Sequence, residues 1–232
     1  MTAIPFVIGL AVVTLLFFVL ANLRGTKDVL SAAVLLRFYL HIASFVTLVV
    51  LVSGLIYLAT GLMSLGSMDF SYSRPVYVAP IGPPGTSQNQ QNADQERQQV
   101  EQQGVEHQKD SQATDLIRGG TLTVIGGLLF GLHIVLRHRQ AQVDGPEIAG
   151  NFLRGYLIVG LITFGVVGLV ALPIGVYQAL KFVLLTPLPT QERVAPGNTL
   201  STGIILTPLW VFYLLGLMRQ ARRPTAEPLT AA

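Results

Sequence analysis

Two histidines carry the sharpest chemistry that this sequence offers. His41 follows Arg37 by about one helical turn at the start of a long apolar run, and His133 precedes Arg137 by about one turn at the end of another. Two imidazoles at one depth on facing antiparallel helices could ligate the iron of a b-type haem axially, or bind a quinone headgroup. The commoner alternative is a neutral histidine that hydrogen-bonds to a backbone carbonyl or a lipid headgroup. The sequence leaves both interpretations open and makes His41 and His133 the candidate cofactor-binding residues.

No other set of residues points to a reaction. The chain has no cysteine, which excludes disulfides, thiolate metal sites, iron–sulfur clusters and a cysteine nucleophile. The sequence contains no His-Glu-x-x-His motif, no phosphate-binding glycine loop and no Ser/His/Asp set. We therefore predict no catalytic residue and no metal site, and we expect a protein that is not an enzyme.

The composition is that of an integral membrane protein. Hydrophobic residues make up 51% of the chain and charged residues only 12%, far from the average for soluble proteins. Five apolar segments are each about 18 residues or longer, enough for a helix to cross a hydrocarbon layer of about 30 Å. They cover residues 4–23, 38–62, 119–136, 152–176 and 200–218. The predicted fold class is an all-α membrane protein with five transmembrane helices.

The chain divides around these spans. An N-terminal transmembrane anchor and a cytoplasmic interfacial segment occupy residues 1–36, and the first transmembrane hairpin is built from residues 37–62 and 118–140. The prolines, glycines and glutamines of residues 63–117 predict a polar external loop, partly disordered, that gains helix as it approaches Asp115. A second transmembrane hairpin follows at 152–223, and a disordered tail at 224–232.

Basic residues mark one side of the membrane. Arginine and lysine residues lie between spans one and two, between spans three and four, and after span five. All three groups are cytoplasmic under the positive-inside rule if the N-terminus is outside. We therefore predict a multi-pass protein of the cytoplasmic membrane with its N-terminus outside and its C-terminus cytoplasmic. Because the basic residues serve as topology signals, the net charge of +3 predicts no nucleic-acid partner.

The two hairpins have similar sequences. Aligning Arg37-Phe-Tyr-Leu with Arg154-Gly-Tyr-Leu pairs the starts of spans two and four, and aligning Arg139-Gln-Ala with Arg219-Gln-Ala pairs the ends of spans three and five. The second alignment sets His133 opposite Tyr213. Two hairpins that start on the same side form a tandem parallel repeat, related by an axis along the membrane normal. Chance similarity between apolar helices flanked by arginine is the alternative.

At these residues the chain resembles an uncharacterised family of bacterial four-helix membrane domains, a domain of unknown function. That family's hairpins begin with an Arg-x-Tyr-Leu-like run and end in a helix with Pro/Gly, Leu, Trp and His before an arginine. The resemblance covers about residues 37–223 and leaves the first span as an addition. The chain departs from the pattern at Tyr213, where a histidine would stand, and its first hairpin lacks Trp. The resemblance implies a fold and no activity.

Glycines predict where the helices pack closely. Gly127 and Gly131 form a GxxxG pair in span three, and span four carries Gly160, Gly165 and Gly168. Small residues at such spacings let helix backbones approach each other.

These features favour one function over two alternatives. Packing faces, spans two to five without central charges and a long external loop are typical of a non-enzymatic accessory or scaffold subunit of a larger plasma-membrane complex. Its partners would be the lipid bilayer and other membrane protein subunits. The alternatives are an electron-transfer subunit that binds haem b or quinone through His41 and His133, and a small transporter or channel built on the repeat.

Overall fold

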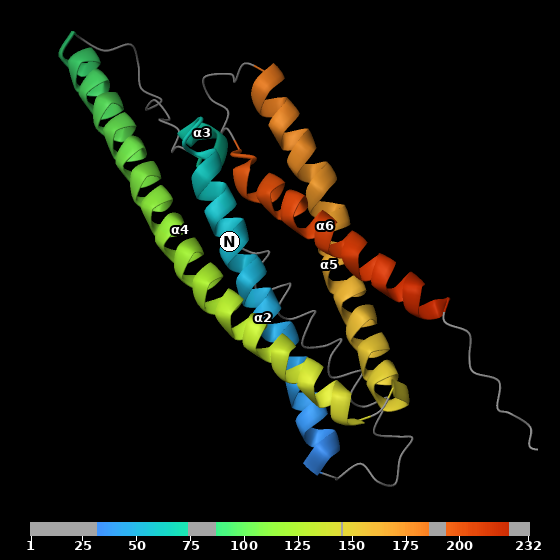
Figure 1. Ribbon diagram of the computed structural model, residues 1–232. Coiled ribbons are helices and arrows are strands. Elements are labelled where there is room, and N and C mark those ends of the chain that lie inside the picture. The colour runs from blue at the N-terminus through green and yellow to red at the C-terminus, as the bar shows by residue number, and fades with distance from the viewer. Residues whose placement is uncertain (1–31, 74–86, 145, 186–193, 223–232) are drawn as a thin grey trace, which may run out of the picture. The chain divides into compact units, whose positions relative to one another are not determined.

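The computed structural model describes residues 32–73, 87–144, 146–185 and 194–222. These residues form helices and short connections, with no strand among them, which confirms the all-α prediction for this part of the chain. The helices are α2 (Ala32–Met63), α3 (Met68–Ser71), α4 (Ser87–Asp144), α5 (Pro146–Leu184) and α6 (Gly197–Ala221) (Figure 1). The predicted first span and the C-terminal tail lie outside the described residues.

Four of these helices are long and apolar enough to cross a membrane. The segments are Leu36–Met63, Gln91–Gln142, Leu153–Leu184 and Gly197–Ala221. A helix is the form that such segments take in lipid, because it satisfies every backbone N–H and C=O within the segment. The four helices correspond to the predicted spans two to five, as a multi-pass membrane protein requires.

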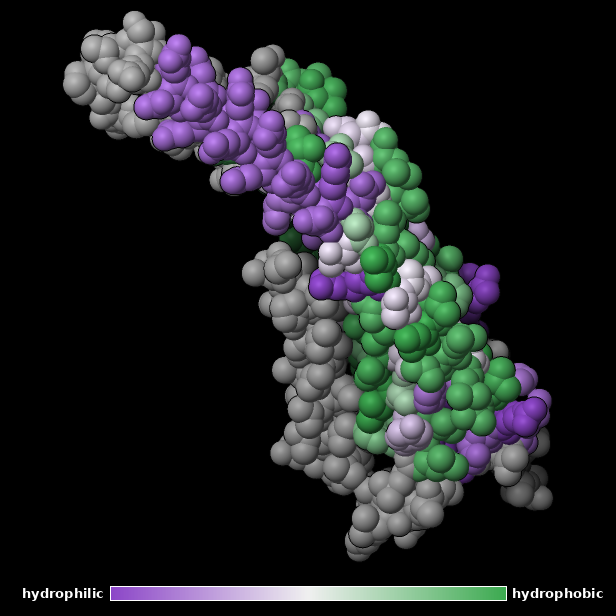
Figure 2. Space-filling model, turned by 90° about the vertical axis from the view of Figure 1, so that its left-hand side faces the viewer, coloured by the Kyte–Doolittle hydropathy of each residue, from purple (hydrophilic) through white to green (hydrophobic). Residues whose placement is uncertain are grey.

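Helix α4 begins much earlier than the sequence analysis expected. The predicted polar loop over 63–117 is helical from Ser87 onward, and α4 runs without a break for 58 residues. At 1.5 Å per residue it is about 87 Å long, far more than a hydrocarbon layer needs. Its glutamine, glutamate and alanine residues are good helix formers, and continuity with an apolar span removes the cost of nucleation. Figure 2 shows the hydrophilic side chains that cover its N-terminal part.

Helix α5 covers the predicted fourth span and extends beyond it at both ends. It continues through Pro173 to Leu184, and it begins at Pro146, where a proline suits the first helical turn. Helix α6 likewise contains Pro208 within its length.

The chain forms two compact units, and each is described by itself. Unit 1 comprises Met1–Leu51, Ile125–Leu169 and Ile205–Ala232, and unit 2 comprises Val52–Val124 and Val170–Ile204. Every contact reported below lies within one unit.

In unit 2 the helices touch at glycines. A Cβ atom added at Gly54 would lie 2.5 Å from the backbone N of Thr123, and one at Gly119 would lie 2.6 Å from the backbone N of Leu58. A Cβ at Gly175 would lie 2.7 Å from the Cα of Leu200. No side chain fits in these places, so backbone meets backbone, as is common between membrane helices.

A polar cluster joins the short helix α3 to α4 in unit 2. The fully buried Gln108 donates through Nε2 to Asp69 Oδ1 at 2.9 Å and to the carbonyl oxygen of Tyr72 at 2.8 Å. The hydroxyl of Tyr72 donates to Asp115 Oδ2 at 3.1 Å. Burial, and then the negative charge of Asp115, raise the pKa of Tyr72 above its ordinary value, so this hydroxyl stays protonated and keeps donating.

Unit 1 has its own close approaches, and they are not at the predicted GxxxG pair. A Cβ at Gly127 would make only an ordinary contact with Leu51 Cδ1 at 3.7 Å, and one at Gly131 would meet no described atom within 4 Å. The tight position on α4 is Gly126, where a Cβ would lie 2.7 Å from the backbone N of Leu51. Residues 127 and 131 point along a different face of the helix from residue 126.

The predicted glycines of span four lie against α6. Gly160 lies under the ring of Tyr213, a Cβ at Gly165 would lie 2.6 Å from Trp210 Cδ1, and one at Gly168 would lie 3.1 Å from Leu206 Cβ. The structure thus places these three glycines where α5 and α6 are closest in unit 1.

Substituting Gly126 tests whether backbone contact holds the first hairpin together. We expect Gly126→Ala to lower the free energy of unfolding by about 1–3 kcal/mol, because the new Cβ would press on a backbone atom of Leu51 that cannot turn aside. The measurement is denaturant titration of the full-length protein in mixed micelles. Gly131→Ala is the matched control: its new Cβ meets no described atom, so it should not lower the free energy of unfolding and should raise it by up to about 1 kcal/mol through helix propensity. Equal stabilities of the two variants would contradict the assignment.

Candidate functional site

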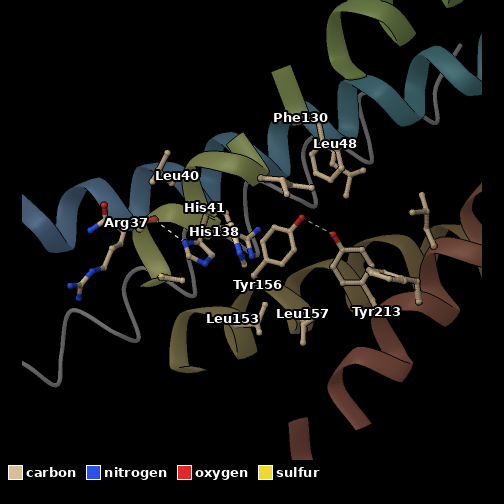
Figure 3. Close-up of a pocket in the computed structure, with 16 residues that line it drawn as sticks. Arg37, Leu40, His41, Leu48, Phe130, His138, Leu153, Tyr156, Leu157 and Tyr213 are labelled. Carbon is tan, nitrogen blue, oxygen red and sulfur yellow. Dashed lines mark hydrogen bonds between the residues drawn. The ribbon is translucent and has the colours of Figure 1, made fainter. Parts of the chain in front are cut away.

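Unit 1 contains a cavity of about 630 Å³ between its four helices (Figure 3). Its volume falls within the range of about 300–1,000 Å³ that is common for small-molecule sites. Residues of every long helix line it: Arg37, Leu40, His41 and Leu48 of α2; Phe130, Ile134, Arg137, His138, Gln140 and Ala141 of α4; Leu153, Tyr156 and Leu157 of α5; and Leu209, Phe212 and Tyr213 of α6.

Arg137 is held in the cavity wall by two neutral groups. Its guanidinium carbon lies 4.4 Å from the centre of the Tyr156 ring, within the distance of a cation–π contact. Its Nη1 also donates to the hydroxyl of the buried Ser44 at 3.3 Å. The two contacts fix the direction of the side chain without neutralising its charge.

Tyr156 and Tyr213 of the cavity wall belong to a cluster of aromatic rings. The hydroxyl of Tyr213 donates to the hydroxyl of Tyr156 at 2.9 Å, and their ring centres are 5.7 Å apart. Phe164 lies 5.5 Å from Tyr213, and Phe45 lies 6.2 Å from Tyr156, ring centre to ring centre. Tyr213 is only 2% exposed because Gly160 leaves room for its ring. Such tilted and edge-on pairs stabilise a packed wall beyond the area that they bury.

The two candidate histidines lie in different surroundings. His41 lines the cavity, and its ring centre is 6.1 Å from that of Tyr156. His133 is not among the cavity-lining residues, and its ring lies 6.3 Å from that of Tyr39. Residues 39 and 41 are about 200° apart around α2. His41 therefore projects from a different face of α2 than Tyr39, the residue that His133 contacts.

Each histidine hydrogen-bonds to a backbone carbonyl of its own helix, as the commoner alternative in the sequence analysis expects. His41 Nδ1 lies 2.9 Å from the carbonyl oxygen of Arg37, and His133 Nδ1 lies 2.7 Å from that of Leu129. A carbonyl can only accept, so Nδ1 carries the proton in both rings. This tautomer is compatible with ligation through Nε2. Placement is therefore the stronger argument: a haem with two axial histidines needs both rings to face one site, and the structure does not bring His41 and His133 to one cavity.

Sequence reasoning missed most of the polar residues of this site. The sequence presents Arg137 only as a basic residue at the cytoplasmic end of span three and does not single out His138, yet both line the cavity. Tyr156 and Tyr213 were noted only as alignment positions. The repeated Arg-x-Tyr-Leu run was the available signal, since its second copy supplies Tyr156, the residue that contacts His41, Arg137 and Tyr213.

Comparisons of the chain with protein-family models, curated protein sequences and solved structures found no match. The chemistry of the site must therefore come from its own residues. Within the described part of the chain, no group of three or more His, Cys, Asp or Glu side chains could hold a metal ion. The cavity offers cationic, aromatic and aliphatic groups, which suit binding.

The tyrosine pair can be tested by removing one hydroxyl. We expect Tyr213→Phe to lower the free energy of unfolding by about 1 kcal/mol, because the hydroxyl of Tyr156 loses a partly buried hydrogen bond. Tyr39→Phe makes the same chemical change at a side chain that is 59% exposed, and it should cost less than about 0.5 kcal/mol. Denaturant titration in micelles measures both, and a Tyr213→Phe protein as stable as the wild type would contradict the role of the pair.

Proposed function

We propose that the protein is a non-enzymatic accessory or scaffold subunit of a larger plasma-membrane assembly. The observation that carries this proposal is the continuity of α4, which extends from a membrane-spanning helix into a polar helical arm. We call residues 91–103 the α4 arm. None of its side chains is buried, and the first buried residues of α4 are Gly104 and Gln108.

The composition of the α4 arm suits recognition of another protein. It is rich in glutamine, whose amide both donates and accepts hydrogen bonds, and its charged residues are Asp94, Glu96, Arg97 and Glu101. A helix that is polar all round gains little from packing on its own unit, so its role is best explained by a partner that it reaches. The buried cluster around Gln108 fixes the base of the arm to α3.

The alternative functions have less support. His41 lines the cavity and His133 does not, which weakens the haem form of the electron-transfer alternative and leaves only His41 for its quinone form. No contact in the described residues favours a transporter or channel over a packed bundle.

We also propose that the two hairpins are a tandem parallel repeat, because their internal contacts correspond. The sequence alignment sets Tyr39 over Tyr156 and His133 over Tyr213, and the rings of Tyr39 and His133 pair as those of Tyr156 and Tyr213 do. Two glycine contacts also correspond under this alignment. The contact of Gly126 with Leu51 in the first hairpin aligns with the contact of Leu206 with Gly168 in the second. The contact of Gly119 with Leu58 aligns in the same way with the contact of Thr199 with Gly175. In each of these contacts one partner is a glycine. It lies on the second helix of the first hairpin, α4, and on the first helix of the second hairpin, α5.

The proposed orientation places the α4 arm outside the cell and the C-terminus in the cytoplasm. Because the chain has no cysteine, single-cysteine variants have no background. We expect a membrane-impermeant maleimide to label Gln98→Cys in intact cells and to label Ala221→Cys only after permeabilisation. Both side chains are exposed, so a difference in labelling reports the side of the membrane and not burial. The reverse pattern would overturn the orientation.

The subunit proposal predicts stoichiometric partners. We expect the protein, tagged at its C-terminus and extracted from native membranes in mild detergent, to migrate as a complex whose other subunits are identified by mass spectrometry. Glu101→Lys should release a partner that docks on the α4 arm, since it reverses a charge on an exposed face.

Glu96→Lys is the control for that experiment, because it makes the same charge reversal about 140° away around the helix. Loss of the partner in Glu101→Lys alone would support docking on one face of the arm. Migration of the wild-type protein as a lone monomer would contradict the proposed function.

A further inference from the structure

The lining of the unit 1 cavity is graded from basic to apolar. Figure 3 shows Arg37, His41 and His138 towards one end, with Leu40 among them, and Leu48, Phe130 and Tyr213 towards the other. None of the described residues that line the cavity is Asp or Glu. A ligand that matches such a lining has an anionic group at one end and an apolar body at the other.

Arg137 supplies the strongest argument for an anion. A charged side chain among membrane-spanning helices is costly unless it is paired or reaches water. The contacts that hold Arg137 are the ring of Tyr156 and the hydroxyl of Ser44, and both groups are neutral. They hold the guanidinium in a fixed direction, and this preorganised fork of donors suits two oxygens of a phosphate.

The apolar wall indicates that the anion belongs to a lipid. Leu153 and Leu157 of α5 and Phe212 of α6 line the same cavity as the arginines. A small hydrophilic anion would leave these side chains without contacts, whereas the acyl chains of a lipid would pack against them. Basic pockets between transmembrane helices on the cytoplasmic side are places where anionic headgroups bind.

We propose that this cavity binds an anionic phospholipid, with its phosphate at Arg137 and the adjoining acyl chains along the leucine and phenylalanine side chains. Arg137 comes from α4, and the apolar wall comes mainly from α5 and α6. A bound lipid therefore joins the two hairpins within unit 1. This proposal is independent of the accessory-subunit role, which rests on the α4 arm.

Lipid binding can be measured on the full-length protein by native mass spectrometry. The probes are phosphatidylglycerol and phosphatidylcholine with identical acyl chains, added to delipidated protein in a non-ionic detergent. We expect phosphatidylglycerol to bind about tenfold more tightly, and Arg137→Gln to remove most of that preference. Equal binding of the two lipids to the wild type would overturn the proposal.

Arg139→Gln is the matched control. It removes the same charge two residues further along α4, from an exposed side chain that does not line the cavity. It should change phosphatidylglycerol binding by less than about twofold, as expected for a screened surface charge. An equal loss in the Arg137 and Arg139 variants would show general surface attraction and would overturn the site.

Two competitors distinguish the sources of the anion. Neither inorganic phosphate nor oleate should displace phosphatidylglycerol when added at the same concentration. Displacement by inorganic phosphate would assign the site to a soluble anion, and displacement by oleate would assign it to a fatty-acid carboxylate. Either result would overturn the phospholipid proposal.

A second measurement needs no variant, so it stands even if Arg137→Gln fails to fold. Photoactivatable phosphatidylglycerol, incubated with wild-type protein, should cross-link to Leu153 and Leu157 in excess over Val166 and Leu169, which are exposed on the same helix. Equal cross-linking to all four residues would mean that the lipid only coats the bundle, and it would overturn the proposal.

Discussion

Helices in a membrane gain little by burying leucine against leucine, because lipid tails are equally apolar, and their association depends on close contact. In this protein the contact is made at glycines. Gly54 and Gly119 bring α2 and α4 together in unit 2, and Gly126 does so in unit 1. Gly165 and Gly175 do the same for α5 and α6 in units 1 and 2 respectively. At Gly54, Gly119, Gly126 and Gly175 the nearest atoms belong to the backbone of the neighbouring helix, so these glycines set the register in which the helices meet.

The α2 residues that line the cavity lie in the half of the helix that precedes its first glycine, Gly54. This half carries large residues such as His41 and Phe45. Tyr156 and Tyr213 fill part of the remaining space, and their hydroxyl groups satisfy each other inside an apolar wall. The rest of the space stays open among cationic and aliphatic groups. The same distribution of small and large residues thus sets both the tight packing and the binding site.

Helix α4 shows how local and tertiary effects combine. Its polar half has the propensity for a helix but no apolar face to bury, and propensity alone makes isolated helices marginal. Continuity with the apolar half and the hydrogen bonds from Gln108 to α3 supply what is missing. These residues have no apolar face to bury, and for that reason the sequence predicts a loop. The structure shows that they are helical because they continue the helix of the neighbouring apolar span.

The sequence by itself determined the apolar spans, because the length and hydropathy of each segment decide whether it can satisfy its backbone in lipid. It also indicated one residue of the cavity, His41. It did not determine which face of each helix turns inward. A helix that is apolar all round has no periodic pattern to orient it. The sequence therefore could not show that Gly126, and not Gly127, meets a neighbouring backbone, or that His41 lines the cavity while His133 does not. Only the tertiary structure decided these rotations, since they depend on which glycine meets a neighbouring backbone, and with them it assembled Arg137, Tyr156 and Tyr213 into one site.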